Sequence, residues 1–178
     1  MSIDPTLSPQ YVLLGFLFIG PSHPYELYQE FSRELGRVWR IGQSQFYAYL
    51  KQAAGAGLAC VSTEPQPNRP PRHIYQISPA GRDAFLEWVR RPTPHLRHLR
   101  LEFLARLYFY RRLKLSGLEQ LIAAQKAVLQ PRLAILHQSI ENSDDRYWRL
   151  VLEFRLHETE AALRWLDRCL AIGLGGNQ

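Results

Sequence analysis

The sequence lacks several features that would place it in well-defined protein classes. It has two cysteines, Cys60 and Cys169, far apart in the chain. Neither has a second cysteine or a histidine at a metal-ligand spacing, so we expect no metal site and interpret both as small apolar residues in a reducing compartment. No apolar run approaches the ~20 residues that cross a bilayer. Met1 to Gln10 lack the basic and apolar regions of a secretory signal, so we expect a cytoplasmic protein.

Groupings of residues that would indicate catalysis are also missing. No pair of acids, Ser/His/Asp set or glycine-rich phosphate loop occurs in a supporting context. The six histidines are scattered along the chain: His23, His73, His95, His98, His137 and His157. We therefore expect no cofactor and no enzyme. A small-molecule enzyme or carrier built in the C-terminal helices is an alternative, but it lacks any acid and base pair that would perform the chemistry.

The chain does carry an excess of positive charge. Its formal net charge is +6 over 178 residues, and no Asp or Glu occurs from Arg37 to Thr63. This balance permits contact with a polyanion but does not establish it. The length allows one generous domain or two small ones, so the fold pattern has to carry the functional interpretation.

Three helices are predicted in the first part of the chain. Residues 9–19 are nearly all apolar and end at Gly20-Pro21, which predicts a short buried helix. A second helix begins at Pro24, where proline suits the first turn, and ends near Gly36. A third begins near Gly42 to Ser44 and directs an apolar arc toward the core: Phe46, Leu50, Ala53 and Gly57.

A hairpin and a fourth helix follow. Residues 58–63 and 73–77 read as paired strands. Four prolines occur in residues 65–72, and since proline cannot continue a ladder, this stretch is predicted to be an exposed tip. A helix begins at Ser78-Pro79, and prolines at 92 and 94 end it. This order predicts a winged helix-turn-helix domain over residues 1–92.

Residues 93–178 read as helices only and form the second predicted domain. Segments 99–113 and 118–140 are helical in pattern, and Pro131 is expected to end or kink the second of them. The last segment carries leucines mostly four and three residues apart, a seam suited to packing against a helix of the same or another chain. We assign dimerisation to this seam: Leu152, Leu156, Leu163, Leu166 and Leu170. The predicted fold class is mainly α with a small β-hairpin.

The residues that favour contact with nucleic acid lie on the third helix and the hairpin. Short polar side chains on the outer face of a helix suit the major groove, where Gln45 or Gln52 could read adenine and Lys51 could meet phosphate or guanine. An ordinary solvated helix face is the competing interpretation. The basic hairpin tip suits phosphate or minor-groove contact. The candidate DNA contacts are Tyr25, Ser44, Gln45, Tyr47, Ala48, Lys51, Gln52, Arg69, Arg72 and His73.

Several motifs resemble the PadR family of bacterial transcriptional regulators. Gly20-Pro21-Ser22-His23-Pro24-Tyr25-Glu26-Leu27 is similar to a family pattern at the second helix, with Pro24 where glycine is common. Trp39 to Tyr47 resembles the entry into the recognition helix, and Arg69 to Tyr75 the basic wing. Ser78 to Arg82 is similar to the start of the fourth helix. Arg100 to Leu107 resembles the start of the all-helical C-terminal domain in one branch of the family.

The resemblance implies a homodimer that binds double-stranded DNA at a pseudo-palindromic site. In that branch the C-terminal helices mediate dimerisation, which would hold two recognition helices about one DNA turn apart. Members usually repress transcription, and some release DNA when a small, often aromatic, effector binds near the dimer interface. The alternative is a winged-helix module that contacts protein without sequence-specific DNA readout.

Overall fold

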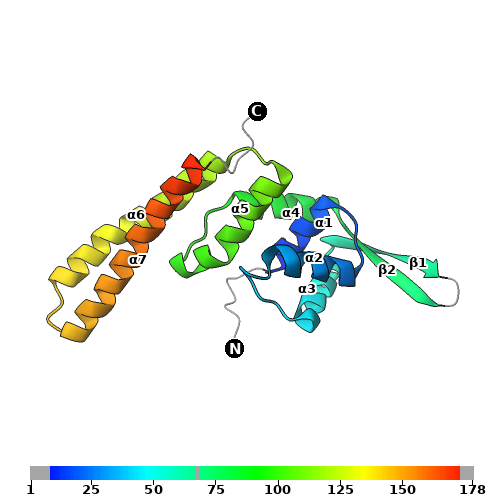
Figure 1. Cartoon of the computed structure of the whole chain (residues 1–178), viewed down its shortest axis with the longest axis horizontal. Helices are drawn as coiled ribbons and strands as arrows, with labels where there is room; N and C mark the ends of the chain where they lie inside the picture. The colour runs from blue at the N-terminus through cyan, green and yellow to red at the C-terminus, as the bar shows by residue number, and fades with distance from the viewer. Residues whose placement is uncertain (1–8, 67–68, 173–178) are drawn as a thin grey trace. The chain divides into compact units, whose positions relative to one another are not determined.

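The computed structural model of the chain describes residues 9–66 and 69–172, without the side chains of residues 66, 69 and 70. The chain forms two compact units, Met1–Val89 with Leu104–Phe109, and Arg90–Phe103 with Tyr110–Gln178. Apart from one two-stranded hairpin, the regular elements of the described residues are helices (Figure 1). The predicted fold class, mainly α with a small hairpin in a winged helix-turn-helix, is confirmed.

The first unit is built on a helix that is apolar on all sides. Helix α1 spans Pro9–Ile19, as the apolar run predicts, and Val12, Leu13 and Leu14 are completely buried. A helix without a polar face has to lie inside the core. Helices α2 (Pro24–Leu35), α3 (Gln43–Gly55) and α4 (Pro79–Arg90) are the other helices of this part of the chain. Phe109 completes the core, with its ring centroid 5.4 Å from that of Phe16.

The hairpin is longer than the sequence predicts. Strand β1 spans Ala59–Gln66 and β2 spans Arg69–Ile77, paired antiparallel. Residues 65–66 and 69–72 belong to the strands, so the expectation that the prolines end the ladder is wrong there, whereas Pro65, Pro71 and Arg72 are exposed as expected. The ladder shifts register between Glu64 and Gln66, where Pro65 faces the Pro70-Pro71 pair. Both strands of a two-stranded sheet are edge strands, and proline is tolerated on edges and at bulges because those positions need not donate to the ladder.

Hydrogen bonds fix the base of the hairpin to the neighbouring helices. The Ser78 hydroxyl donates to the Gly57 carbonyl (2.6 Å) and accepts from the Gly81 backbone nitrogen (3.0 Å). Gly57 adopts φ +72°, which favours glycine. A Cβ on Gly81 would lie 1.9 Å from the Leu58 carbonyl oxygen, so only glycine allows this approach. The end of α3, the hairpin and the start of α4 are thus held in one arrangement.

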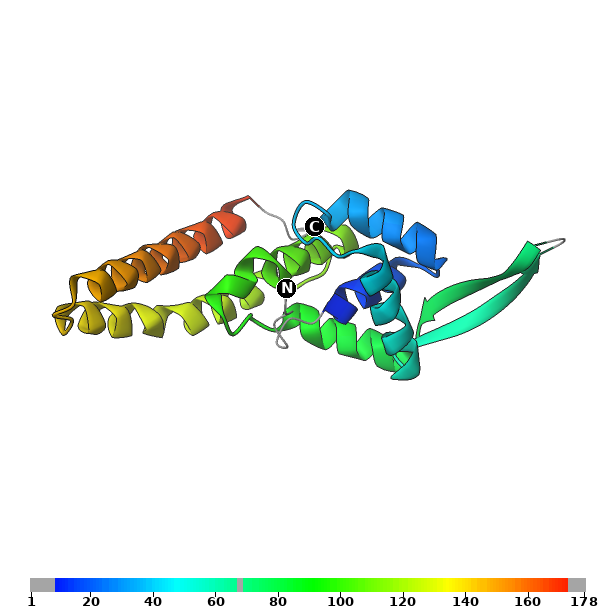
Figure 2. The same cartoon turned by 90° about the horizontal axis from the view of Figure 1, so that it is seen from below.

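The second unit is dominated by two long helices, α6 (Leu118–Glu141) and α7 (Arg146–Ala171). They run side by side in opposite directions (Figures 1 and 2). A 3-10 turn, η1 (Leu96–Arg100), and helix α5 (Glu102–Leu113) precede them. Of the two outcomes expected at Pro131, an end or a kink, the first is wrong, because α6 continues through it. Pro131 and Ala127, the residue whose carbonyl loses its partner, are both exposed, and water can satisfy that carbonyl.

Two further features define the second unit. Buried Gln125 of α6 holds the segment before η1, because its amide oxygen accepts from the backbone nitrogen (2.7 Å) and hydroxyl (2.9 Å) of Thr93, and its amide nitrogen donates to the Thr93 carbonyl (3.0 Å). No helix within the described ranges is long and apolar enough to span a membrane.

Candidate nucleic-acid interface

Helix α3 is fixed in rotation by its buried face. Phe46, Leu50 and Ala53 are all at most 2% exposed. The Phe46 ring packs with its centroid 5.3 Å from that of Phe31 and 5.4 Å from that of Tyr28, both on α2. This packing determines which residues of α3 face outward.

The residues predicted for the outer face of α3 all face solvent. These exposed residues are Ser44, Gln45, Ala48, Lys51 and Gln52. They combine a hydroxyl, two amides, one cation and a methyl group, and no acid lies in the sequence from 37 to 63. Such a surface can enter a major groove without repelling phosphate, and its amides can pair with base edges.

Two tyrosines connect the buried and exposed faces of α3. Tyr47 is half-buried, and its hydroxyl accepts from Gln43 Nε2 (2.8 Å). A tyrosine with its ring packed and its hydroxyl near the surface can contact a phosphate. Gln45 Nε2 donates to the Tyr49 hydroxyl (3.1 Å). For Gln45 to read a base with both amide groups, it has to exchange this contact for one with DNA.

The first turn of α2 lies beside the base of the hairpin. Ser22 and Tyr75 each donate a backbone hydrogen bond to the other's carbonyl, both at 3.0 Å. His23 Nδ1 also donates to the His73 carbonyl (3.0 Å). Tyr25, 59% exposed, follows directly on α2 and accepts from Gln29 Nε2 (2.8 Å). These bonds place Tyr25 near the wing, although no sequence pattern indicates this pairing.

The hairpin projects away from the helices of the first unit (Figure 2). Arg72 pairs in register with Glu64, and His73 pairs with Thr63. Opposite charges in register attract one another, so Glu64 offsets part of the Arg72 charge. Thr63 Oγ1 lies 3.4 Å from His73 Nδ1. Arg69 is the first residue of β2, and its side chain lies outside the described part of the structure.

Two basic residues that the sequence patterns miss lie just before α3. Arg37 and Arg40 are exposed in the turn between α2 and α3, and both line a cavity of about 510 Å³ with Arg33 and buried Trp39. Glu34 accepts a hydrogen bond from Arg33 Nε (3.0 Å) and raises the pKa of Arg33. The charge of Arg33 is thereby partly balanced. Periodicity assigns no role to loop residues, and only the folded turn brings these cations together.

The leucine seam of α7 has a partner within the same chain. Leu156 and Leu166 are at most 8% exposed, and Leu152 and Leu163 are half-buried. Helix α7 packs on α6, so this seam holds the helix pair together. Leu170 is 41% exposed. The assignment of these leucines to a dimer stays a prediction.

A second apolar face of α7 is exposed. Tyr147, Leu150 and Phe154 are 67%, 65% and 64% exposed. Their spacing of three and four residues puts them on one side of the helix, opposite the leucine seam. This exposed face is not apparent from the sequence, because the more regular leucine spacing dominates the pattern of α7.

The two cysteines differ in exposure. Cys60 is exposed on β1, whereas Cys169 is buried, and burial raises the pKa of the Cys169 thiol. Across the described ranges, no group of three or more His, Cys, Asp or Glu side chains is placed to hold a metal ion.

Two family models match the chain. Residues 13–87 match the transcriptional regulator PadR-like family, and residues 99–172 match the family described as virulence activator alpha C-term. The first match covers α1 to α4 with the hairpin, and the second covers the helical segment from η1 to the end of α7.

Individual proteins of known sequence and structure are also similar. Negative transcriptional regulator PadR of Bacillus subtilis (strain 168) is 26% identical over 174 residues, 92% of this chain and 96% of that protein. A probable transcriptional regulator of Mycobacterium tuberculosis is 31% identical over 71 residues, 40% of this chain and 38% of that protein.

Among solved structures, Bacillus subtilis PadR in complex with operator DNA is 25% identical to this chain, with a TM-score of 0.49. The similarity covers 93% of this chain and 99% of that one. The same protein in complex with p-coumaric acid is 25% identical, with a TM-score of 0.43, 96% of this chain covered and 98% of that one. The two family models match consecutive parts of the chain, in agreement with the motifs and the observed order of elements. The chain thus consists of a PadR-like transcriptional regulator domain, residues 13–87, followed by a virulence activator alpha C-terminal domain, residues 99–172.

Proposed function

We propose that this chain is a sequence-specific DNA-binding transcriptional repressor that acts as a homodimer on a pseudo-palindromic operator. The match of residues 13–87 to a family of transcriptional regulators supports the general function. The Bacillus subtilis relative, similar along 92% of this chain, is named a negative transcriptional regulator, and this supports repression as the direction of control.

The observation that carries the proposal is the outer face of α3. It is exposed and free of acids, and the packing of Phe46 and Leu50 fixes its direction. We place Ser44, Gln45, Ala48, Lys51 and Gln52 at the major groove, with Tyr47 at a phosphate. The wing residues Arg69, Arg72 and His73, with Tyr25 beside the wing base, contact the adjacent backbone or minor groove.

The dimer forms through the second unit. We place the contact with the partner on the exposed face of α7 that contains Tyr147, Leu150 and Phe154, because clustered exposed aromatic and aliphatic side chains favour a protein interface. The leucine seam, which includes Leu170, supports this contact by holding α7 on α6. A two-fold dimer then presents two α3 helices to half-sites about 34 Å apart.

A small molecule controls the binding of the repressor to DNA. A small effector, aromatic in some relatives of this type, releases the repressor by binding the second unit and changing the spacing of the α3 helices. The chain is a regulator and not an enzyme, and it works in the cytoplasm, where its DNA target is.

Fluorescence anisotropy tests the proposal directly. The purified chain is titrated onto the duplex upstream of its own coding region, at two salt concentrations and with random duplex as competitor. We expect saturable binding at about 10 nM protein that resists the competitor. The proposal would be contradicted if the chain bound both duplexes equally weakly, if added salt abolished that binding, and if no promoter fragment of a genomic library bound more tightly. That result would favour a protein-contact module.

A double variant isolates the wing. Arg69→Ala with Arg72→Ala should lower the affinity for DNA and flatten its dependence on salt, because fewer phosphates are neutralised. Arg164→Ala on α7 is the matched control, since Arg164 is exposed and, among the described residues, forms an ion pair only with Glu160 on the same helix. An unchanged affinity in the double variant would remove the wing from the interface and leave α3 to carry it.

A further inference from the structure

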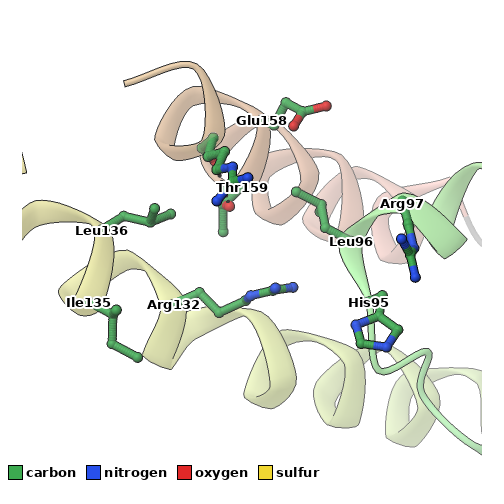
Figure 3. Close-up of a pocket in the computed structure, with 9 residues that line it drawn as sticks. His95, Leu96, Arg97, Arg132, Ile135, Leu136, Glu158 and Thr159 are labelled. Atoms are coloured by element: carbon green, nitrogen blue, oxygen red, sulfur yellow. Dashed lines mark hydrogen bonds between the residues drawn. The ribbon is translucent and has the colours of Figure 1, made fainter. Parts of the chain in front are cut away.

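A cavity of about 710 Å³ lies within the second unit, between η1, α6 and α7 (Figure 3). Its volume is in the range of small-molecule sites, roughly 300–1,000 Å³. Each of the three elements contributes an arginine: Arg97 from η1, Arg132 from α6 and Arg155 from α7. The cavity therefore has polar groups directed at it from three separate parts of the chain.

The charge of this cavity is unbalanced. Three arginines and one acid, Glu158, line it. Within the described residues, Arg132 and Arg155 form no ion pair. Arg132 extends from α6 toward His95 (Figure 3). Placing like charges around one cavity costs free energy, which a bound anion would offset.

Apolar side chains form another part of the lining, beside the polar His95 and Thr159. Leu96, Ile135 and Leu136 line the cavity next to the cations, and Leu96 points into it from η1 (Figure 3). Ile135 is 63% exposed, although its side chain is one that proteins usually bury. A ligand with an apolar body would cover these side chains, while its anionic groups meet the guanidinium groups, which bind carboxylate and phosphate through paired hydrogen bonds.

We infer that this cavity binds a small organic dianion, a phosphate monoester or dicarboxylate with a compact apolar body. Two negative charges match Arg132 and Arg155, the two lining arginines that form no ion pair within the described residues. Arg132 and Arg155 bind the anionic groups, Leu96 and Leu136 contact the apolar body, and Glu158 disfavours ligands that carry more negative charge. The assignment of this cavity as the effector site of the repressor rests on the proposed function.

The position of η1 explains how such a ligand acts on DNA binding. The segment 90–103 joins α4 to α5, and residues 104–109 of α5 belong to the first unit. Thr93 is already held on α6 by Gln125. A ligand that bridges Arg97, Arg132 and Arg155 fixes the rest of this segment onto α6 and α7. It thereby favours one conformation of the connection, and DNA affinity changes by the same factor as ligand affinity.

Calorimetry on the full chain, without DNA, tests the site. The probes are phenyl phosphate, phthalate, benzoate and benzyl alcohol. We expect saturable binding of at least one of the two dianions below about 1 mM, with benzoate weaker and benzyl alcohol absent. Arg132→Gln and Arg155→Gln should each weaken dianion binding about tenfold or more, because each removes a charge-assisted hydrogen bond. Glu158→Gln should strengthen it.

The control is Arg164→Gln, which also removes an exposed arginine of α7 but lies outside the cavity. It should bind the dianion as the unaltered chain does. Thermal melts check that every variant is folded. Failure of both dianions to bind the folded chain, or an equal loss in Arg164→Gln, overturns the inference.

Operator anisotropy separates this inference from the proposed function. With the bound dianion at saturation, we expect operator affinity to change at least about threefold in the unaltered chain and not at all in Arg132→Gln. Without dianion, both cavity variants should bind DNA normally, and a weakened complex would make the cavity a DNA contact and overturn the inference. A chain that binds the dianion but no DNA contradicts the proposed function and leaves the anion site standing.

Discussion

Helices α3 and α7 are both held by one buried stripe, but their opposite faces differ. The exposed face of α3 carries polar and small side chains with one lysine, whereas that of α7 carries Tyr147, Leu150 and Phe154. The buried stripes, centred on Phe46 in α3 and Leu156 in α7, explain the fold and do not distinguish the functions of the helices.

The outward faces are what differ in function. A polar face without acids tolerates the phosphates beside a major groove, while it gains little from contact with another protein. Burial of an apolar face lowers the free energy by about 25 cal/mol per Å² removed from water, and such a face has no hydrogen-bonding groups for a base edge. The comparison supports the proposal that α3 recognises DNA and that α7 mediates self-association, and variants can separate the two roles.

The largest effect is expected from the buried seam. Leu166 is completely buried, so Leu166→Ala should lower the free energy of unfolding of the second unit by about 3 kcal/mol through lost burial and the cavity left behind. Urea denaturation followed by far-UV circular dichroism measures this. Leu170→Ala, at a position 41% exposed, should cost less than about 1 kcal/mol. If the two substitutions lowered the free energy of unfolding equally, the leucine seam would not form the core of the second unit.

The next effect concerns the outer face of α7. Tyr147→Glu with Phe154→Glu should convert the dimer to a folded monomer, because the charges cannot be buried in the contact. Operator affinity should then fall about 100-fold, since the second half-site is no longer bound by the same particle. Light scattering coupled to size exclusion gives the mass, and Arg164→Glu serves as the control. A dimer that persists in the double variant would move the interface elsewhere.

A smaller effect is expected when an acid is placed on α3. Gln45→Glu should weaken operator binding about tenfold or more by repelling phosphate and removing an amide, without changing the mass of the dimer. Gln138→Glu makes the same change at an exposed site of α6. Operator anisotropy on both variants checks this, and similar losses in the two would show a general effect of charge.

The smallest effect is that of Lys51→Ala. If Lys51 meets a phosphate, affinity should fall a few-fold on all sequences, and the slope of log affinity against log salt should decrease by about one. If it meets guanine, the loss should be confined to operators with guanine at that position. Titrations at several salt concentrations on operator and random duplex distinguish these two roles, and no change on either would exclude Lys51 from the interface.

Periodicity predicted most of the first unit. The apolar run of residues 9–19 and the arc of Phe46, Leu50 and Ala53 on α3 gave the helices and their buried faces, because burial sets the pattern. The predicted residues of the outer face of α3 are exposed as expected. The extent of the wing was wrong, since proline at a bulge of a two-stranded sheet needs no ladder bond.

Long-range contacts explain what periodicity missed. Helix α4 lies close to Leu58, which requires glycine at position 81, and Ser22 pairs with Tyr75. Both contacts are between residues far apart in the chain. The three arginines of the cavity in the second unit likewise come from separate elements. No local pattern encodes such groupings.

Hydroxyl-radical footprinting of the operator tests the central claim most directly. The account predicts two protected blocks about one helical turn apart on one face of the duplex. The double variant Tyr147→Glu with Phe154→Glu should protect a block only when the protein concentration is much higher. Gln45→Glu should reduce the protection of both blocks equally. A single protected block for the unaltered chain, or two blocks that Gln45→Glu leaves unchanged, would contradict the assignment of DNA recognition to α3 and of dimerisation to α7.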